Sequence, residues 1–274
     1  MSCSELSLEA GVPLAGTATR ADSWLLVEHP GPWGRDPVAD TELPPGLADA
    51  LLATGRRVMF VRRPGRANGV VVYSAETTEE GGTLRRIEVG RIEDVVSIDP
   101  ERDGAVVDGP LVLVCAHRRR DACCGRLGVP VFNALRVHVQ HDLLWRSSHH
   151  GGHRFAANVL ALPYGVQLGR VRPPEARAVA TALAERRIPL EHYRGRSHHT
   201  PEVQAADATL RRLDGLDRIG DVRLVEHDGD RVTLEVASGT VELSVTAVIG
   251  PSLPASCGAA PEPSTSFVAT VVRR

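Results

Sequence analysis

The chain has 274 residues, of which 42% are hydrophobic, so it can bury a sizeable core, and its length favours two domains over one. Its 32 basic residues nearly balance its 34 acidic ones, for a net charge of -2, which leaves no electrostatic basis for binding nucleic acid or an anionic membrane. Every basic residue is Arg, which excludes enzymes that depend on a Schiff-base or P-loop lysine. We therefore expect the partners to be proteins or small molecules.

The cysteine count and the N-terminal sequence bear on the compartment. Residues 1–15 carry acidic side chains and have no basic segment followed by a long apolar run, so we expect no signal peptide. No stretch approaches the ~18 uninterrupted apolar residues of a membrane span. Five cysteines, an odd number, argue against a disulfide framework. These features predict a cytoplasmic protein without membrane association.

The first hundred residues show apolar runs bounded by Gly and Pro. They predict a strand over 23–28, a helix over 45–54 and strands over 57–61, 69–73 and 84–89. The segment 99–110 is rich in Pro, Asp and Gly and is typical of a connection between domains. We therefore predict an N-terminal α/β module over 1–104, with a βαββ order, and a second domain over 105–274.

The second half alternates strands and helices. The expected elements are a buried strand over 111–114, a loop over 116–128, a helix that starts at Pro130, a strand over 143–145, a loop over 149–153, a short helix over 155–160, a strand over 165–171 and a helix over 174–187. Thr200 and Pro201 mark the start of a further helix that ends at Gly215. Alternating apolar residues over 232–236 and 241–245 predict a β-meander, and we expect a loop over 255–266. The expected fold class is α/β (α+β).

Two clusters of chemically versatile residues follow neighbouring strands. Cys115, Cys123 and Cys124 lie in the first loop, and His149, His150 and His153 lie in the second. Parallel strands of a strand–helix–strand unit end at the same sheet edge, so we expect the clusters to face each other. Thiolate and imidazole suit zinc, copper, iron and iron–sulfur centres, whereas calcium and magnesium need carboxylates.

Simpler interpretations remain open for these residues. An isolated Cys is often a small buried hydrophobe, and Cys123-Cys124 could form a vicinal dithiol. The Arg118–Arg120 run is typical of a solvated loop, but it also lies inside the loop of candidate ligands, so a functional role stays open. Cys3 and Cys257 are distant in sequence from both clusters, and we do not expect them to be ligands.

The two motifs together resemble the sucrase/ferredoxin-like family. The pattern C-x-H-x-x-R-D-x-x-C-G starts at Cys115, H-x-G-G-H-R-F-A-x-N starts at His149, and WLLVEHPGPWG starts at Trp24. The resemblance implies a thioredoxin-like ferredoxin domain. Beside this domain, the first hundred residues are expected either to form a thioredoxin-like module without a cluster or to extend the sheet, and the C-terminal part is expected to form a helical and β-meander extension. It also implies a [2Fe–2S] cluster held by Cys115, Cys124, His149 and His153.

This resemblance leads to the expectation of a soluble electron carrier rather than an enzyme, with a redox partner protein or a small reductant and with proton-coupled redox chemistry. Two neutral imidazoles in place of two thiolates make reduction easier, as in Rieske centres. Two alternatives are a structural Cys₂His₂ zinc site and a dithiol oxidoreductase that uses Cys123-Cys124.

Overall fold

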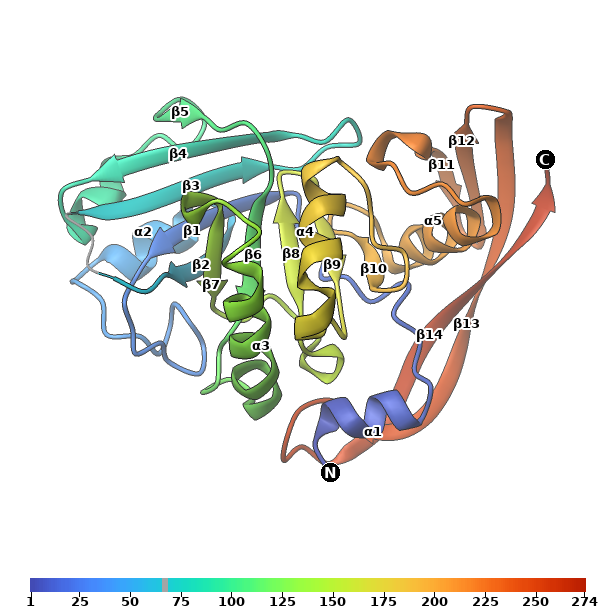
Figure 1. The fold of residues 1–274 in the computed structure, drawn as a ribbon, viewed down its shortest axis with the longest axis horizontal. Coiled ribbons are helices and arrows are strands. Elements are labelled where there is room, and N and C mark those ends of the chain that lie inside the picture. The colour runs from blue at the N-terminus through green and yellow to red at the C-terminus, as the bar shows by residue number, and fades with distance from the viewer. Residues whose placement is uncertain (66–68) are drawn as a thin grey trace.

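The computed structural model describes residues 1–65 and 69–274, and within them two β-sheets organise the fold. The larger is a ten-stranded sheet with the order β10-β9-β8-β6-β7-β2-β1-β3-β4-β5. The smaller has four strands in the order β11-β12-β13-β14. Figure 1 shows the large curled sheet on one side of the molecule and the second sheet on the other. The expected mixed α/β class is confirmed.

The strands of the large sheet are β1 (Ser23–Glu28), β2 (Arg57–Arg62), β3 (Val70–Glu76), β4 (Thr83–Val89), β5 (Ala105–Val106), β6 (Leu111–Cys115), β7 (Leu144–Ser147), β8 (Val159–Leu162), β9 (Val166–Leu168) and β10 (Tyr193–Arg196). The second sheet contains β11 (Arg223–Asp228), β12 (Arg231–Val236), β13 (Gly239–Pro254) and β14 (Pro261–Arg273). The α-helices are α1 (Cys3–Glu9), α2 (Leu47–Ala53), α3 (Ala122–Leu135), α4 (Ala176–Ala184) and α5 (Pro201–Asp214). Short 3-10 helices are η1 (Ile92–Ser97), η2 (His141–Leu143), η3 (His153–Phe155), η4 (Pro173–Glu175) and η5 (Ile219–Asp221).

The large sheet repeats one connection pattern. β1 pairs with β2 in parallel across α2 and with β3 in antiparallel. β6 pairs with β7 in parallel across α3 and with β8 in antiparallel. The orders β4-β3-β1-β2 and β9-β8-β6-β7 therefore match, and the two halves join through the antiparallel pair β2–β7.

Alternation along the strands sends apolar side chains to both faces of this sheet. Val112 and Val114 of β6 pack with α3 and α4, which lie side by side over the sheet in Figure 1. Leu111 and Leu113 belong to a separate cluster on the opposite face. There Tyr73 and Trp145 meet edge to face at 5.9 Å between ring centroids. Because β3 and β7 are not neighbours in the sheet, this contact requires the sheet to curl.

The second sheet packs on α5. Val203, Ala206 and Leu210 of this helix form one core with Val232, Leu234 and Leu243 of the sheet. The pair β13–β14 extends well beyond this core, and its far end lies beside α1 in Figure 1. Chain segments from both ends of the sequence thus meet next to the large sheet.

Three local structures differ from the expected ones. The helix expected to start at Pro130 begins eight residues earlier, at Ala122, because the Asp121 side chain accepts the Cys123 N–H at 2.8 Å and caps it. Residues 155–160 form the end of η3 and the start of β8 rather than a helix, since this segment pairs with β6. Much of the expected loop 255–266 is strand β14, which pairs with β13.

Other expectations are confirmed. α5 is capped by Thr200, has Pro201 at its first position and stops at Gly215 in the left-handed conformation. β12 and β13 pair from Val236 with Gly239, as the meander requires. The predicted boundary at residue 104 falls between two strands of the same sheet, and the division into domains stays a prediction. Within residues 1–65 and 69–274, the helices are too short or too polar to cross a membrane.

Candidate metal centre

The carboxyl ends of β6 and β7 bring the two motifs together. Cys115 is the last residue of β6 and lies opposite Ser147 of the parallel strand β7. His149 follows two residues later, and its Nδ1 lies 3.9 Å from the Cys115 sulfur. The prediction that both loops leave the same sheet edge is therefore confirmed.

Helix α3 supplies the second sulfur. Because the helix begins at Ala122, Cys124 lies in its first turn, fully buried against Cys115. Gly128 allows this approach, since a Cβ there would lie 2.0 Å from the Cys115 carbonyl oxygen. The Cys124 thiol donates a hydrogen bond that lowers the pKa of Cys115 despite its burial, and the same contact raises the pKa of Cys124. The two sulfurs therefore form a coupled pair.

His149 lies beside the two sulfurs, and His153 lies next to His149 outside this group. Donor atoms of Cys115, Cys124 and His149 all lie within 4.8 Å of one another, a spacing at which they could hold a metal ion. His153 does not belong to this group of three, but its Nδ1 lies 3.2 Å from His149 Nε2. Burial, followed by the charge of His149, lowers the pKa of His153 to about 4, so its ring is neutral at pH 7.

The loop between the histidines is shaped by two glycines with positive φ. A Cβ on Gly151 would meet Thr19 Oγ1 at 1.7 Å, and one on Gly152 would meet Arg194 Nη2 at 2.2 Å. Asn158 donates its side-chain N–H to the Gly152 carbonyl at 2.8 Å. Arg194 in turn donates to the Asn158 side-chain oxygen at 3.0 Å and to the Gly151 carbonyl at 3.3 Å. This buried network fixes the loop that carries His149 and His153.

Sequence reasoning missed the role of Arg194, which lies far along the chain on β10. It is fully buried, and burial lowers its pKa to about 9, while the nearby Cys124 and Cys115 raise it. The guanidinium therefore places positive charge close to the two sulfurs, where thiolate would form. No local pattern around Arg194 marks it for this role.

Two further histidines surround the site. The backbone N–H of His149 donates to His117 Nδ1 at 3.3 Å, so the histidine in the C-x-H motif positions the second loop. His117 also meets the Trp33 ring edge to face at 5.7 Å. His150 is fully buried, and burial lowers its pKa to about 4. Neither ring nitrogen of His150 finds a hydrogen-bond partner among the described residues.

The arginine run lies outside the cluster of donors. Arg118 and Arg119 are exposed, as the solvated-loop interpretation expects. Arg126 donates to Ser2 Oγ at 3.0 Å and to Glu5 Oε1 at 2.8 Å and so holds α1 against α3.

The vicinal cysteines separate into two groups. Cys124 belongs with Cys115 and His149, whereas Cys123 belongs with Cys3, Cys257 and Asp121. The alternative of a dithiol oxidoreductase that uses Cys123-Cys124 is therefore wrong, because the helix directs the two thiols to different neighbours. Cys3 and Cys257, which are distant in sequence from both clusters, lie next to Cys123 in the fold.

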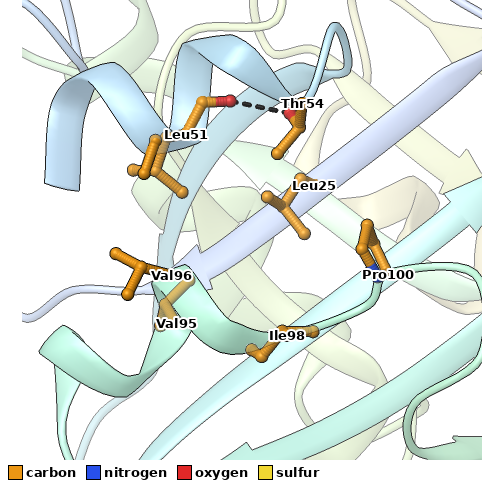
Figure 2. Close-up of a pocket in the computed structure, with 8 residues that line it drawn as sticks. Leu25, Leu51, Thr54, Val95, Val96, Ile98 and Pro100 are labelled. Atoms are coloured by element: carbon orange, nitrogen blue, oxygen red, sulfur yellow. Dashed lines mark hydrogen bonds between the residues drawn. The ribbon is translucent and has the colours of Figure 1, made fainter.

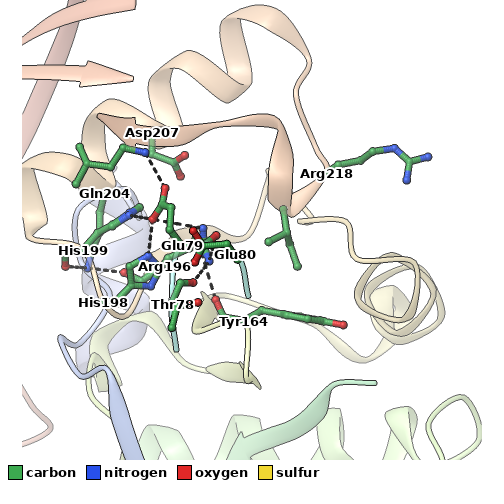
Figure 3. A network of polar contacts seen from close by, with 12 residues as sticks. Thr78, Glu79, Glu80, Tyr164, Arg196, His198, His199, Gln204, Asp207 and Arg218 are labelled. Carbon is green, nitrogen blue, oxygen red and sulfur yellow. Dashed lines mark hydrogen bonds and ion pairs between the residues drawn. The ribbon is translucent and has the colours of Figure 1, made fainter. Parts of the chain in front are cut away.

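Two other features of the fold lie outside these groups. Figure 2 shows a small pocket between β1, α2 and η1, lined by Leu25, Leu51, Val95 and other residues without charged side chains. Figure 3 shows Glu79, which accepts hydrogen bonds from the Nε2 atoms of His198 and His199, each at 2.8 Å. The Leu224 N–H donates to the same carboxylate at 2.7 Å. This network joins the β3–β4 turn to the segment between β10 and α5 and to β11.

The comparisons with known proteins place the residues of this candidate metal centre inside a family match. The sucrase/ferredoxin-like family model matches residues 14–195, and the chain belongs to that family. Two curated relatives are both named Altered inheritance of mitochondria protein 32. The protein from Clavispora lusitaniae is 35% identical over 95 residues, which cover 32% of this chain and 35% of the relative. The protein from Eremothecium gossypii is 29% identical over 99 residues, which cover 31% of this chain and 32% of the relative.

The match with these relatives is partial. The chain spans about a third of the length of each. No solved structure matches the chain.

These findings correct the expected function. The relatives are named for the inheritance of mitochondria, and neither name is that of an iron–sulfur or electron-transfer protein. The expectation of a [2Fe–2S] electron carrier is therefore wrong, together with the proton-coupled redox chemistry attached to it. What the structure supports is coarser: groups of Cys and His side chains whose spacing suits a metal.

Proposed function

We propose that this chain is a metal-binding protein whose centre is formed by Cys115, Cys124, His149 and His153. The observation that carries the proposal is the convergence of three donor atoms within 4.8 Å at the end of one parallel strand pair. The fourth residue, His153, lies next to this group, with its Nδ1 3.2 Å from His149 Nε2. The family match over residues 14–195 includes all four residues.

The donor set limits the metal. Two thiolates and two imidazoles suit zinc, copper and iron, and they do not suit calcium or magnesium. Four protein donors close a zinc site, which makes its role structural. Of the chain's own residues, His117 and Asn158 orient the histidine loop and Arg194 compensates thiolate charge.

The half of the sheet around this centre supports a thioredoxin-like arrangement as part of the same proposal. The order β7-β6-β8-β9, with a parallel pair followed by antiparallel strands and then α4, is what that arrangement requires. The first half has the same order without cysteine at the end of β1, where His29 follows Glu28.

Metal analysis of the purified full chain tests the proposal. We expect bound metal in the full chain, and the loss of one centre in each of Cys115→Ser, Cys124→Ser, His149→Ala and His153→Ala. His138→Ala is the matched control, because His138 is exposed and should leave metal content unchanged. Zinc, copper and iron measured separately identify the metal. Full retention of metal in the four variants would overturn the proposal.

A further inference from the structure

Three cysteines from distant parts of the chain meet outside the centre described above. Cys3 lies in α1, Cys123 in the first turn of α3, and Cys257 in the connection between β13 and β14. Cys3 and Cys123 are almost completely buried, and Cys257 is partly exposed. Cys3 and Cys257 fall outside residues 14–195, so this group draws on both ends of the chain beyond the family match.

The spacing of the sulfurs is that of ligands around one metal ion. The Sγ atoms of Cys3 and Cys123 lie 3.7 Å apart, those of Cys123 and Cys257 3.3 Å, and those of Cys257 and Cys3 3.6 Å. Three sulfurs bound tetrahedrally to zinc at about 2.3 Å are about 3.8 Å from one another. A disulfide needs a separation of about 2.05 Å, and it would leave one of the three unpaired.

A carboxylate completes the group. Asp121 Oδ1 and Oδ2 lie 3.9 and 3.8 Å from the Cys3 sulfur. The same oxygens accept the backbone N–H of Cys123 and of Cys257, each at 2.8 Å. Asp121 is therefore fixed in orientation beside the sulfurs. A buried carboxylate next to three sulfurs, each able to form thiolate, is costly unless a cation compensates it.

We infer that Cys3, Cys123, Cys257 and Asp121 form a second metal site, separate from the centre at Cys115, that binds zinc or a similar thiophilic divalent ion. The three thiols lose their protons on binding, and the four protein ligands close the site. Its role is structural: one ion joins α1, α3 and the β13–β14 connection. The inference does not depend on the proposed centre, because the two share no ligand.

The helix start explains how adjacent cysteines serve two sites. The Asp121 cap begins α3 at Ala122, and successive helical residues point about 100° apart. Cys123 is thereby directed to α1 and Cys257, and Cys124 to β6. One capping residue thus orients both sulfurs and joins one of the sites itself.

Zinc titration of the full chain and of Cys257→Ser tests the inference. Cys257 lies in a connection, so the variant should keep its fold, which circular dichroism checks. We expect the full chain to bind one zinc more than Cys257→Ser, and Ser256→Ala to match the full chain. Cobalt in place of zinc should give a thiolate-to-metal charge-transfer band that weakens in Cys257→Ser.

Two results would overturn the inference. One is equal zinc binding and equal cobalt absorption in the full chain and in Cys257→Ser. The other is a native mass lighter by two hydrogen atoms together with a Cys123–Cys257 disulfide peptide. Parallel measurements on Cys115→Ser separate the two centres, since that variant should lose the first site and keep the second.

Discussion

Gly152 occupies a position in the histidine loop where no residue with a side chain fits. Its φ is +72°, and a Cβ would lie 2.2 Å from Arg194 Nη2, an atom of a fully buried side chain. The H-x-G-G-H pattern is therefore a packing requirement as well as a spacing of donors. The left-handed backbone and the buried guanidinium of Arg194 both require glycine at position 152.

Gly152→Ala should lower the free energy of unfolding by about 1–3 kcal/mol and weaken metal binding, because the loop must shift away from Arg194. Chemical denaturation and metal titration measure the two effects. Gly220→Ala is the control, since a Cβ at Gly220 meets nothing within 4 Å. Wild-type metal affinity in Gly152→Ala would show that the loop does not position the ligands.

Among the secondary-structure elements, helix α3 determines the geometry of both proposed sites. Its apolar spacing and Pro130 suggest a start at residue 130, but the Asp121 cap extends it to residue 122 with proline inside it. The signal was present in the sequence, since Asp before a run of small residues is a recognised cap. It was outweighed by the preference of proline for the first turn.

Replacing Gly128 by Ala should push α3 away from β6. The added Cβ would lie 2.0 Å from the Cys115 carbonyl oxygen, which is backbone and cannot move freely. We expect a loss of about 1–3 kcal/mol in stability, as for overpacked cores, and reduced metal content at Cys115 and Cys124. Thermal unfolding and metal analysis check this, and unchanged metal content would contradict the role given to α3.

The Glu79 network predicts how stability depends on pH. Burial raises the pKa of Glu79, but hydrogen bonds from His198 and His199 outweigh it, so the folded pKa lies below the unfolded one. The contribution of ionised Glu79 to folding stability is therefore complete above the unfolded pKa, near 4.3, and is lost as pH falls below that value. Burial also lowers the pKa of His198, which adds a loss of stability as pH falls below about 6.5.

Denaturation between pH 7 and pH 3 tests this dependence. Glu79→Gln should lower stability at pH 7 by about 2 kcal/mol and flatten its fall below pH 5. Glu80→Gln is the matched control, because Glu80 is an exposed neighbour of Glu79. Equal pH profiles for the two variants would exclude Glu79 as the source.

Across the whole molecule, how well the sequence predicts a contact depends on how far apart in the chain its residues lie. The β6–α3–β7 unit and the meeting of Cys115 with His149 depend on neighbouring elements and on general rules of chain connection, and both were predictable. The contact of Cys3 with Cys257 joins residues 254 positions apart and depends on the long β13–β14 pair, which the small residues and prolines of 255–266 concealed. Arg194 was likewise hidden by its distance from the motifs.

The two halves of the large sheet should unfold together. The β2–β7 pair and the contact of Tyr73 with Trp145 cross the boundary predicted at residue 104. Scanning calorimetry of the full chain should therefore show one transition for this sheet. Two well-separated transitions that divide the chain near residue 104 would contradict this coupling.

X-ray absorption at the edge of the bound metal tests the proposed centre most directly. Measured on Cys257→Ser, which lacks the second site, the spectrum should show sulfur and imidazole nitrogen together in the first coordination shell. When the same variant also carries His149→Ala and His153→Ala, the bound metal, and with it the absorption edge, should be lost. A first shell without imidazole before those replacements would contradict the account.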